Sequence, residues 1–229
     1  MSVYFFKAMG RVKTDMLELC AMVEDRLHKA VVAVINRDAA LARTVIDADV
    51  EIDAKEVDIE EELLKILALN QPVAVDLRFL VATLKINSDL ERIGDLAVNI
   101  AERALVLSRK MHDAAPVDLA QMSSAVQAML RRSIDSLVNL DSQIAAAVCR
   151  DDDAIDQMKH EIDDEIKIRM AAASEKDAID VLVALLRVTR DLERVADHAT
   201  NIAEDLIYIS EGRIIRHHAE DYVRTHAPK

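Results

Sequence analysis

The spacing of apolar residues predicts a chain built almost entirely of long helices. Between residues 14 and 36, apolar side chains recur every three or four positions, which is the period of one helix face. The same period returns in five further stretches. We therefore predict helices over residues 14–36, 39–69, 73–110, 119–149, 153–173 and 177–210.

Polar and turn-forming residues separate these stretches. Asn36-Arg37-Asp38 is a polar break, and Asn70-Gln71-Pro72 ends the second helix because proline disfavours helical geometry in the residue before it. Ser174-Glu175-Lys176 is the corresponding turn in the second half. Gly212 is well placed to cap the last helix. Because such short connections force neighbouring helices to run antiparallel, the pattern predicts three-helix bundles.

The predicted fold is all-α, with two tandem antiparallel three-helix bundles related by internal duplication. The first bundle covers residues 1–113 and the second covers 116–212, with Pro116 at the boundary. A C-terminal tail, 213–229, is short of apolar residues, so we expect less order there. The apolar segment at residues 3–6 is expected to pack on the bundle or on a partner.

An eleven-residue phrase that occurs twice is the evidence for the duplication. Residues 89–99 read DLERIGDLAVN and residues 191–201 read DLERVADHATN. Extended to residues 102 and 204, the two copies are identical at ten of fourteen positions. Glu91 and Asp95 in the first copy correspond to Glu193 and Asp197 in the second.

Each copy aims two carboxylates at one spot, because positions i and i+4 lie on the same side of a helix. Like charges at this spacing destabilise an isolated helix by a few tenths of a kcal/mol. Two further acidic pairs with the same spacing lie in the helix before each copy: Asp49 with Asp53, and Asp152 with Asp156.

Residue counting places these pairs at matching heights. At 1.5 Å per residue, the acids of both helices in each half lie about 26–35 Å from the turn that joins those helices. Counting does not fix the rotation of each helix. If the acidic faces also meet, four carboxylates converge at a seam between two helices, which suits hard or borderline cations such as Mg²⁺, Mn²⁺, Fe or Zn²⁺. Asn99 and Asn201, one turn further along, are candidate additional ligands.

A simple alternative explains the same residues without metal. Arg92 and Arg194 can pair with Asp95 and Asp197 at i, i+3 spacing and make an ordinary solvated charged stripe. His160 and His198 have no counterparts in the first half, so we expect incidental roles for them. The chain has no pair of Glu-x-x-His motifs of the di-iron type and no P-loop.

The turn at residues 70–78 is a second candidate site. It reads NQPVAVDLR, and the exposed tip between two helices could dock a partner through Gln71, Pro72, Asp76 and Arg78. The local alternative is helix initiation, because proline suits a first helical position and an acid suits the first turn.

Composition excludes several function classes. The net charge of −13 argues against general nucleic-acid binding, because a phosphate backbone would be repelled. No apolar run approaches the roughly 20 residues of a membrane span, and no secretory signal is expected. Cys20 and Cys149 are isolated and predict neither a structural disulfide nor a thiolate metal cluster. The natural interpretation is a cytoplasmic protein.

The chain resembles the PhoU family of phosphate-transport accessory regulators. The resemblance rests on NQPVAVDLR (70–78), DLERIGDLAVNIAE (89–102), DLERVADHATNIAE (191–204) and EGRIIRH (211–217), and covers about residues 14–217. It implies two similar three-helix bundles with multinuclear metal clusters held by Glu/Asp-x-x-x-Asp motifs. The matching pairs here are Asp49/Asp53, Glu91/Asp95, Asp152/Asp156 and Glu193/Asp197.

The resemblance further implies a non-enzymatic cytoplasmic regulator. Such a protein bridges the ATPase of a phosphate-specific ABC transporter and a membrane-bound sensor histidine kinase, which keeps phosphate-starvation genes off when phosphate is plentiful. Membrane association is then at most peripheral, through these partners. The chain departs from internal symmetry at the tip, because the second half reads SEKDAIDVL where the first reads QPVAVDLR.

Two alternatives remain open from the residues alone: a metal-dependent enzyme acting on phosphate compounds, and a metal-free helical scaffold. The carboxylates are the only general acid/base groups that the first would use. A homodimer is expected, since long amphipathic helices often leave apolar surface to bury.

Overall fold

In the computed structural model, residues 3–110, 119–215 and 222 are described, and they form seven helices without a strand. The helices are α1 (Val3–Asn36), α2 (Ala39–Asp47), α3 (Asp49–Asn70), α4 (Val75–Ser108), α5 (Leu119–Asn139), α6 (Ser142–Ala172) and α7 (Lys176–Glu211).

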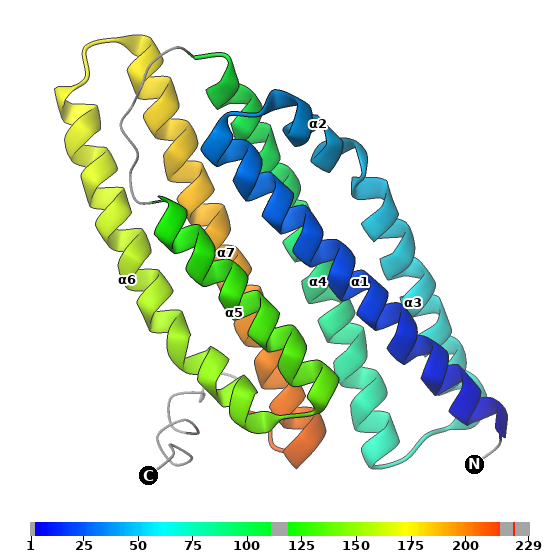
Figure 1. Cartoon of the computed structure of the whole chain (residues 1–229). Coiled ribbons are helices and arrows are strands. Elements are labelled where there is room, and N and C mark those ends of the chain that lie inside the picture. Colours follow the sequence, from blue (N-terminus) through cyan, green and yellow to red (C-terminus); the bar gives the residue numbers. More distant parts are fainter. Residues whose placement is uncertain (1–2, 111–118, 216–221, 223–229) are drawn as a thin grey trace.

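The helices run nearly parallel or antiparallel to one another and form an elongated bundle (Figure 1). α4 and α7 make the most extensive contact in the molecule. α1, α2 and α3 pack on α4, whereas α5 and α6 pack on α7. The prediction of an all-α fold made of tandem helical bundles is confirmed.

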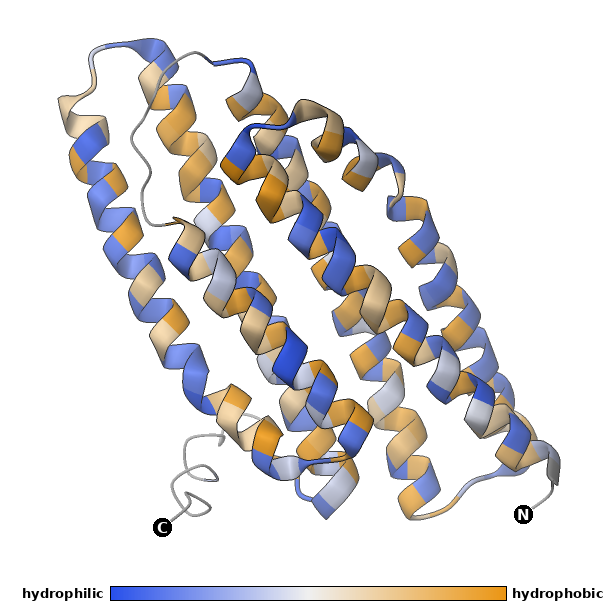
Figure 2. Ribbon diagram, in the orientation of Figure 1, coloured by the Kyte–Doolittle hydropathy of each residue, from blue (hydrophilic) through white to orange (hydrophobic). Residues whose placement is uncertain are grey.

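Buried apolar stripes explain why these helices associate. Apolar and polar residues alternate around each helix, so that every helix carries bands of both kinds (Figure 2). α4 and α7 bury residues along almost their whole length, from Leu80 to Leu107 and from Ala178 to Ile209. Burying a large aliphatic side chain contributes about 1.5–3 kcal/mol. The central position of the two helices therefore follows from their wide apolar faces.

Two predicted helix boundaries are wrong. The single helix expected over 39–69 is interrupted at Ala48, which caps α2 and precedes α3. The expected break near residues 150–152 lies instead at Leu140, which has a φ of 52°. Asp141 then caps α6, because its carboxylate accepts hydrogen bonds from the backbone N–H groups of Gln143 and Ile144.

The ends of other helices also differ from the predictions. α1 begins at Val3 rather than at residue 14, and Phe5 is buried, so the N-terminal segment does pack on the bundle. α4 begins at Val75, since Ala74 has a φ of 49° that a helix cannot include. Gly212 caps α7 with a φ of 71°, as predicted.

The division into residues 1–113 and 116–212 stays a prediction. The segment 111–118 lies outside the described residues, as do residues 216–221 and 223–229 of the tail 213–229. Tyr222 is described, and its hydroxyl donates a hydrogen bond to Glu211 at 2.6 Å.

Polar side chains join the same pair of helices in each half. The buried Asn87 on α4 donates from Nδ2 to the backbone carbonyl and the carboxylate of Glu56 on α3, at 2.9 and 3.0 Å. At the corresponding place on α7, the buried Thr189 donates to Asp163 of α6 at 3.2 Å. These hydrogen bonds fix the lateral position of α3 on α4 and of α6 on α7.

Gly94 brings α3 unusually close to α4. A Cβ added at Gly94 would lie 3.2 Å from two carbon atoms of Ile52, a buried residue of α3. A larger residue would push the two helices apart. Gly94 also directly precedes Asp95, so this close approach sets the spacing of the acidic side chains described below.

Gly94→Leu is expected to destabilise the protein by about 1–3 kcal/mol, because an overpacked seam must move backbone or side chains. The matched control is Gly10→Leu, where an added Cβ meets nothing within 4 Å. The control should stabilise α1 by about 0.5–1 kcal/mol through helix propensity. Urea unfolding of both variants and the wild type measures the difference; equal shifts in the midpoint would contradict the close-approach argument.

Candidate metal centre on two acidic seams

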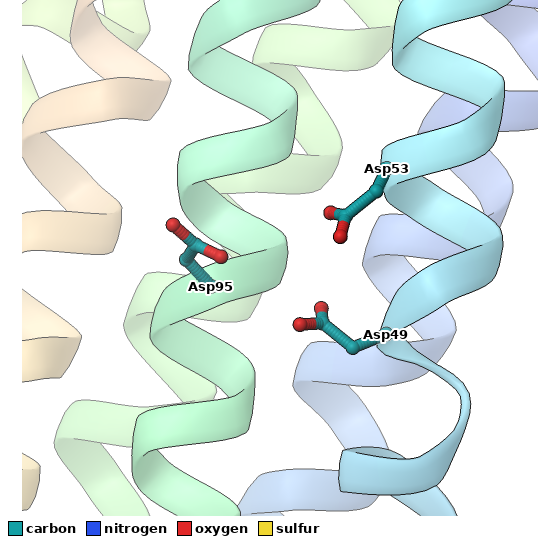
Figure 3. A group of neighbouring side chains, drawn as sticks. All are labelled: Asp49, Asp53 and Asp95. Carbon is teal, nitrogen blue, oxygen red and sulfur yellow. The ribbon is translucent and has the colours of Figure 1, made fainter.

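We call the α3–α4 contact with Asp49, Asp53, Glu91 and Asp95 the first seam. Asp49 is the first residue of α3, Asp53 lies one turn later, and Asp95 faces both from α4. One carboxylate oxygen of each of the three lies within 4.8 Å of the others. Figure 3 shows Asp49 and Asp53 extending from α3 toward α4, with Asp95 on the near face of α4.

The like negative charges of these three carboxylates repel one another. Partial burial raises the pKa of Asp49, and the charges of Asp53 and Asp95 raise it further. Arg26 on α1 lowers this pKa. However, the Arg26 guanidinium is held by Glu51, whose carboxylate lies 2.5 Å from its Nη2. The triad thus lacks a close ion pair of its own among the described residues, and mutual repulsion remains.

Glu91 lies beside the triad rather than within it. Burial raises its pKa, and the charges of Asp95, Glu56 and Asp53 contribute in the same direction, whereas Arg92 lowers it. Glu56 also has a raised pKa, from burial and from the charges of Glu60 and Asp53. Asn99 is half-buried one turn beyond Asp95. The first seam is therefore a row of at least five carboxylates.

The second seam is the α6–α7 contact with Asp152, Asp156, Glu193 and Asp197. Burial raises the pKa of Asp152 to about 6, with further contributions from Asp197 and Asp156. Burial and the charge of Asp156 also raise the pKa of Asp197, which His198 and Arg194 lower. Acids of both helices thus raise one another's pKa in each half, but among the described residues only the first seam brings three carboxylates within 4.8 Å of one another.

One residue makes the second seam different from the first. Lys159 lies three residues after Asp156, as Glu56 lies three residues after Asp53. Its Nζ is 3.7 Å from the Glu193 carboxylate and 3.8 Å from that of Asp163. The second seam therefore contains an ammonium group where the first has another carboxylate. Sequence reasoning missed both Glu56 and Lys159, although their shared position relative to the aspartate pairs was visible.

The arginines do not neutralise the seams as the simple alternative supposed. Among the residues that the structure describes, no ion pair within 4.0 Å joins Arg92 to Asp95 or Arg194 to Asp197. Their charges act at longer range, on the pKa values of Glu91 and Asp197.

The second-half residues His198 and Asn201 connect the halves. His198 Nδ1 lies 2.8 Å from the Asp89 carboxylate, and Asn201 donates a long hydrogen bond of 3.4 Å to the same oxygen. Both contacts cross from α7 to α4. Asn201 is thus engaged with α4, and His160 lies against the backbone carbonyl of Asp156, 2.7 Å away.

The tip residues occupy the connection between α3 and α4. Gln71 is exposed in a left-handed conformation with a φ of 44°, and Pro72 and Asp76 are half-buried. Arg78 packs against the end of α7, where its Nη1 would lie 2.9 Å from a Cβ added at Gly212. Gly is favoured at this cap by its φ of 71°, and the nearby Arg78 ties the tip of the first half to the second.

The residues of the first seam fit a bound metal ion. Their donors are oxygens on two helices, within reach of one another, and they repel when ionised. A divalent cation would supply the positive charge that the first seam lacks, and hard cations prefer such oxygen ligands. In the second seam Lys159 supplies part of that charge, so the need for metal there is smaller.

None of the described helices combines the length and the apolar character needed to cross a membrane.

Comparison with known proteins places the chain in a family. The PhoU domain model matches residues 16–104 and again 119–206, one copy in each half. A phosphate-specific transport system accessory protein PhoU homolog from Aquifex aeolicus is 37% identical over 212 residues, which cover 93% of this chain and 95% of the relative. The Pseudomonas aeruginosa homolog is 34% identical over 207 residues, which cover 90% and 85%.

Solved structures agree with this assignment. The crystal structure of PhoU from Pseudomonas aeruginosa has a TM-score of 0.88 at 33% identity, and the match covers 91% of this chain and all of the other. The regulatory protein PhoU from Streptococcus pneumoniae has a TM-score of 0.84 at 29% identity, with 92% and 98% covered. The duplicated acidic phrase, the paired bundles and these matches together show that the chain belongs to the PhoU family.

Proposed function

We propose that this protein is a cytoplasmic regulator of phosphate uptake and of phosphate-starvation signalling. Its relatives are named as accessory proteins of a phosphate-specific transport system, and they match nearly the whole chain. In this proposal the protein is an adaptor between the ATPase subunit of a phosphate ABC transporter and a sensor histidine kinase. It acts by binding its partners, and it is not an enzyme.

The observation that carries the metal part of the proposal is the carboxylate triad of the first seam. Asp49, Asp53 and Asp95 repel one another, and a metal ion would turn that repulsion into attraction between α3 and α4. Asp152, Asp156, Glu193 and Asp197 would hold metal in the second seam. Glu91 and Asn99 are candidates to complete the first site, whereas Asn201 is directed to Asp89 of α4 instead. Fe, Zn, Mn and Mg all accept such ligands.

Metal would make each bundle a firmer docking surface. A ligand that binds only the folded state stabilises that state. A metal-filled seam would therefore hold its two helices in one arrangement. The tip with Gln71, Pro72, Asp76 and Arg78 is a proposed partner contact, and it occurs in the first half alone. A homodimer is part of the same proposal.

Removing metal is expected to lower the melting temperature of the wild-type protein. At a metal concentration of about 100 times Kd, binding adds about 2.7 kcal/mol of stability. Differential scanning fluorimetry with each metal and with a chelator measures this. Asp53→Asn/Asp95→Asn should abolish the part of the response that comes from the first seam and should stabilise the chelated protein, since it removes repulsion.

The matched control is Asp58→Asn/Glu61→Gln, which removes two exposed carboxylates from the same helix α3. It should keep the wild-type response to metal. An equal response to metal in all three proteins would contradict metal binding at the triad, whereas no response in any of them would favour the metal-free scaffold.

In the chelated protein, the contribution of Asp152 to the free energy of unfolding should be larger at about pH 5 than at about pH 7. The folded-state pKa of this residue is raised to about 6, so its contribution is fully present below the unfolded-state pKa. That contribution is lost as the pH rises through about 6, where the folded protein must give up a proton that burial favours keeping. Asp152→Asn should flatten this part of the pH profile, measured by urea unfolding. An unchanged profile would show that Asp152 is already ionised at acidic pH.

Repression of a phosphate-starvation reporter tests the regulatory role. In phosphate-rich medium, a deletion strain that carries the wild-type gene should keep the reporter off. A strain with Asp95→Ala/Asp197→Ala, at the same protein level, should lose most of that repression. Silence of the reporter in the deletion strain would refute the regulatory function. Full repression by the variant would show that the acidic seams are not needed for it.

A further inference from the structure

One end of the bundle gathers exposed apolar side chains. Of seventeen exposed large hydrophobic residues among those described, seven fall in residues 3–14 and 64–78, which we call the apolar-basic end. They are Tyr4, Phe6, Leu64, Leu69, Val73, Val75 and Leu77. The N-terminus of α1 and the connection between α3 and α4 lie at the same end in Figure 1, and α1 packs on α3 and α4.

The first turns of α1 divide their aromatic residues between the core and solvent. Phe5 is only 1% exposed, whereas Tyr4 and Phe6 are 60% and 65% exposed. Phe5 and Phe6 touch edge to face, with ring centroids 5.7 Å apart. The buried Phe5 ring therefore anchors the N-terminal end of α1, and its contact holds the exposed Phe6 ring in place. The rings lie before residue 16, where the first match to the PhoU domain model begins.

The charge of this end is opposite to that of the rest of the molecule. Residues 1–14 contain Lys7, Arg11 and Lys13 and no acid. Residues 64–78 contain Lys65, Arg78 and a single acid, Asp76. The two segments together carry a net charge of +4, whereas the remaining 24 basic and 41 acidic residues carry −17. The net positive charge of these segments comes from their near lack of acids, and Lys65 is paired with Glu61 and Glu62 just outside them.

We propose that the apolar-basic end binds directly to the surface of an anionic lipid bilayer. Exposed aromatic residues flanked by Lys and Arg are the composition of elements that lie in the membrane interface. The rings and the aliphatic loop residues would enter the boundary between headgroups and acyl chains. Lys7 and Arg11, both exposed, would contact lipid phosphates. The acidic remainder, including both seams, would be repelled by the same surface and would face away from it.

This proposal does not rest on the proposed function, because it uses no metal, transporter or kinase. It goes beyond membrane association through partners, since the protein itself would touch lipid. Attraction of basic residues to an anionic surface falls with salt, whereas apolar insertion does not. Both contributions can therefore be separated by experiment.

Cosedimentation of the full chain with lipid vesicles tests the proposal. The wild type should bind vesicles of mixed phosphatidylcholine and phosphatidylglycerol, bind much less to phosphatidylcholine alone, and lose binding as salt is raised. Lys7→Gln/Arg11→Gln should weaken binding on the order of tenfold. Tyr4→Ser/Phe6→Ser should weaken it by about tenfold or more, because it removes the inserted rings.

The matched control is Val57→Ser/Ile168→Ser, which removes two exposed apolar side chains from α3 and α6, away from this end. It should bind vesicles like the wild type. Absence of wild-type binding, or equal loss in the control, would overturn the proposal. Sedimentation velocity without lipid tests whether a second copy of the chain covers this end instead. The lipid proposal is wrong if three results occur together: the wild type is a dimer, Tyr4→Ser/Phe6→Ser is a monomer, and the wild type does not bind vesicles. This end is then an interface between two copies.

Discussion

The packing of α4 against α7 is the contact on which the rest of the molecule depends. These helices are the two copies of the duplicated segment, and each carries the layer of helices of its own half. Lys85 with Asp205 and His198 with Asp89 span the contact through polar groups, at 3.2 and 2.8 Å. Because the buried faces of α4 and α7 meet each other, their acidic faces turn outward toward α3 and α6. One packing preference thus produces two acidic seams.

Each seam opposes the hydrophobic packing that creates it. Apolar residues such as Ile52 and Gly94 hold α3 and α4 at close range, and that range places like charges within a few ångströms. Such an arrangement loses stability when its carboxylates are ionised, and in the proposed function a bound cation would restore that stability. A fold selected only for stability would place lysine or an apolar residue there, as the second seam has partly done with Lys159.

The sequence predicted the fold class because the helical period is long and rarely interrupted. It also predicted that the acidic pairs lie at matching heights, because counting residues along two antiparallel helices fixes those heights. It failed at Leu140 and Asp141, where a left-handed residue and a side-chain cap end a pattern that otherwise looks continuous. The sequence could not predict how far each helix is rotated about its own axis. Only packing shows that Asp49, Asp53 and Asp95 converge, that Glu91 stands aside and that Asn201 turns to Asp89.

The interruption at Ala48 has a consequence for how firmly the two seams are held. Asp49 is the first residue of α3, where the helix dipole favours a negative charge by about 0.3–1 kcal/mol. Asp152 stands ten residues inside α6, beyond the reach of that effect. Helix ends open more readily than helix interiors. Amide hydrogens around Asp49 will therefore exchange with solvent sooner than those around Asp152, and local opening will release one seam while the other stays closed.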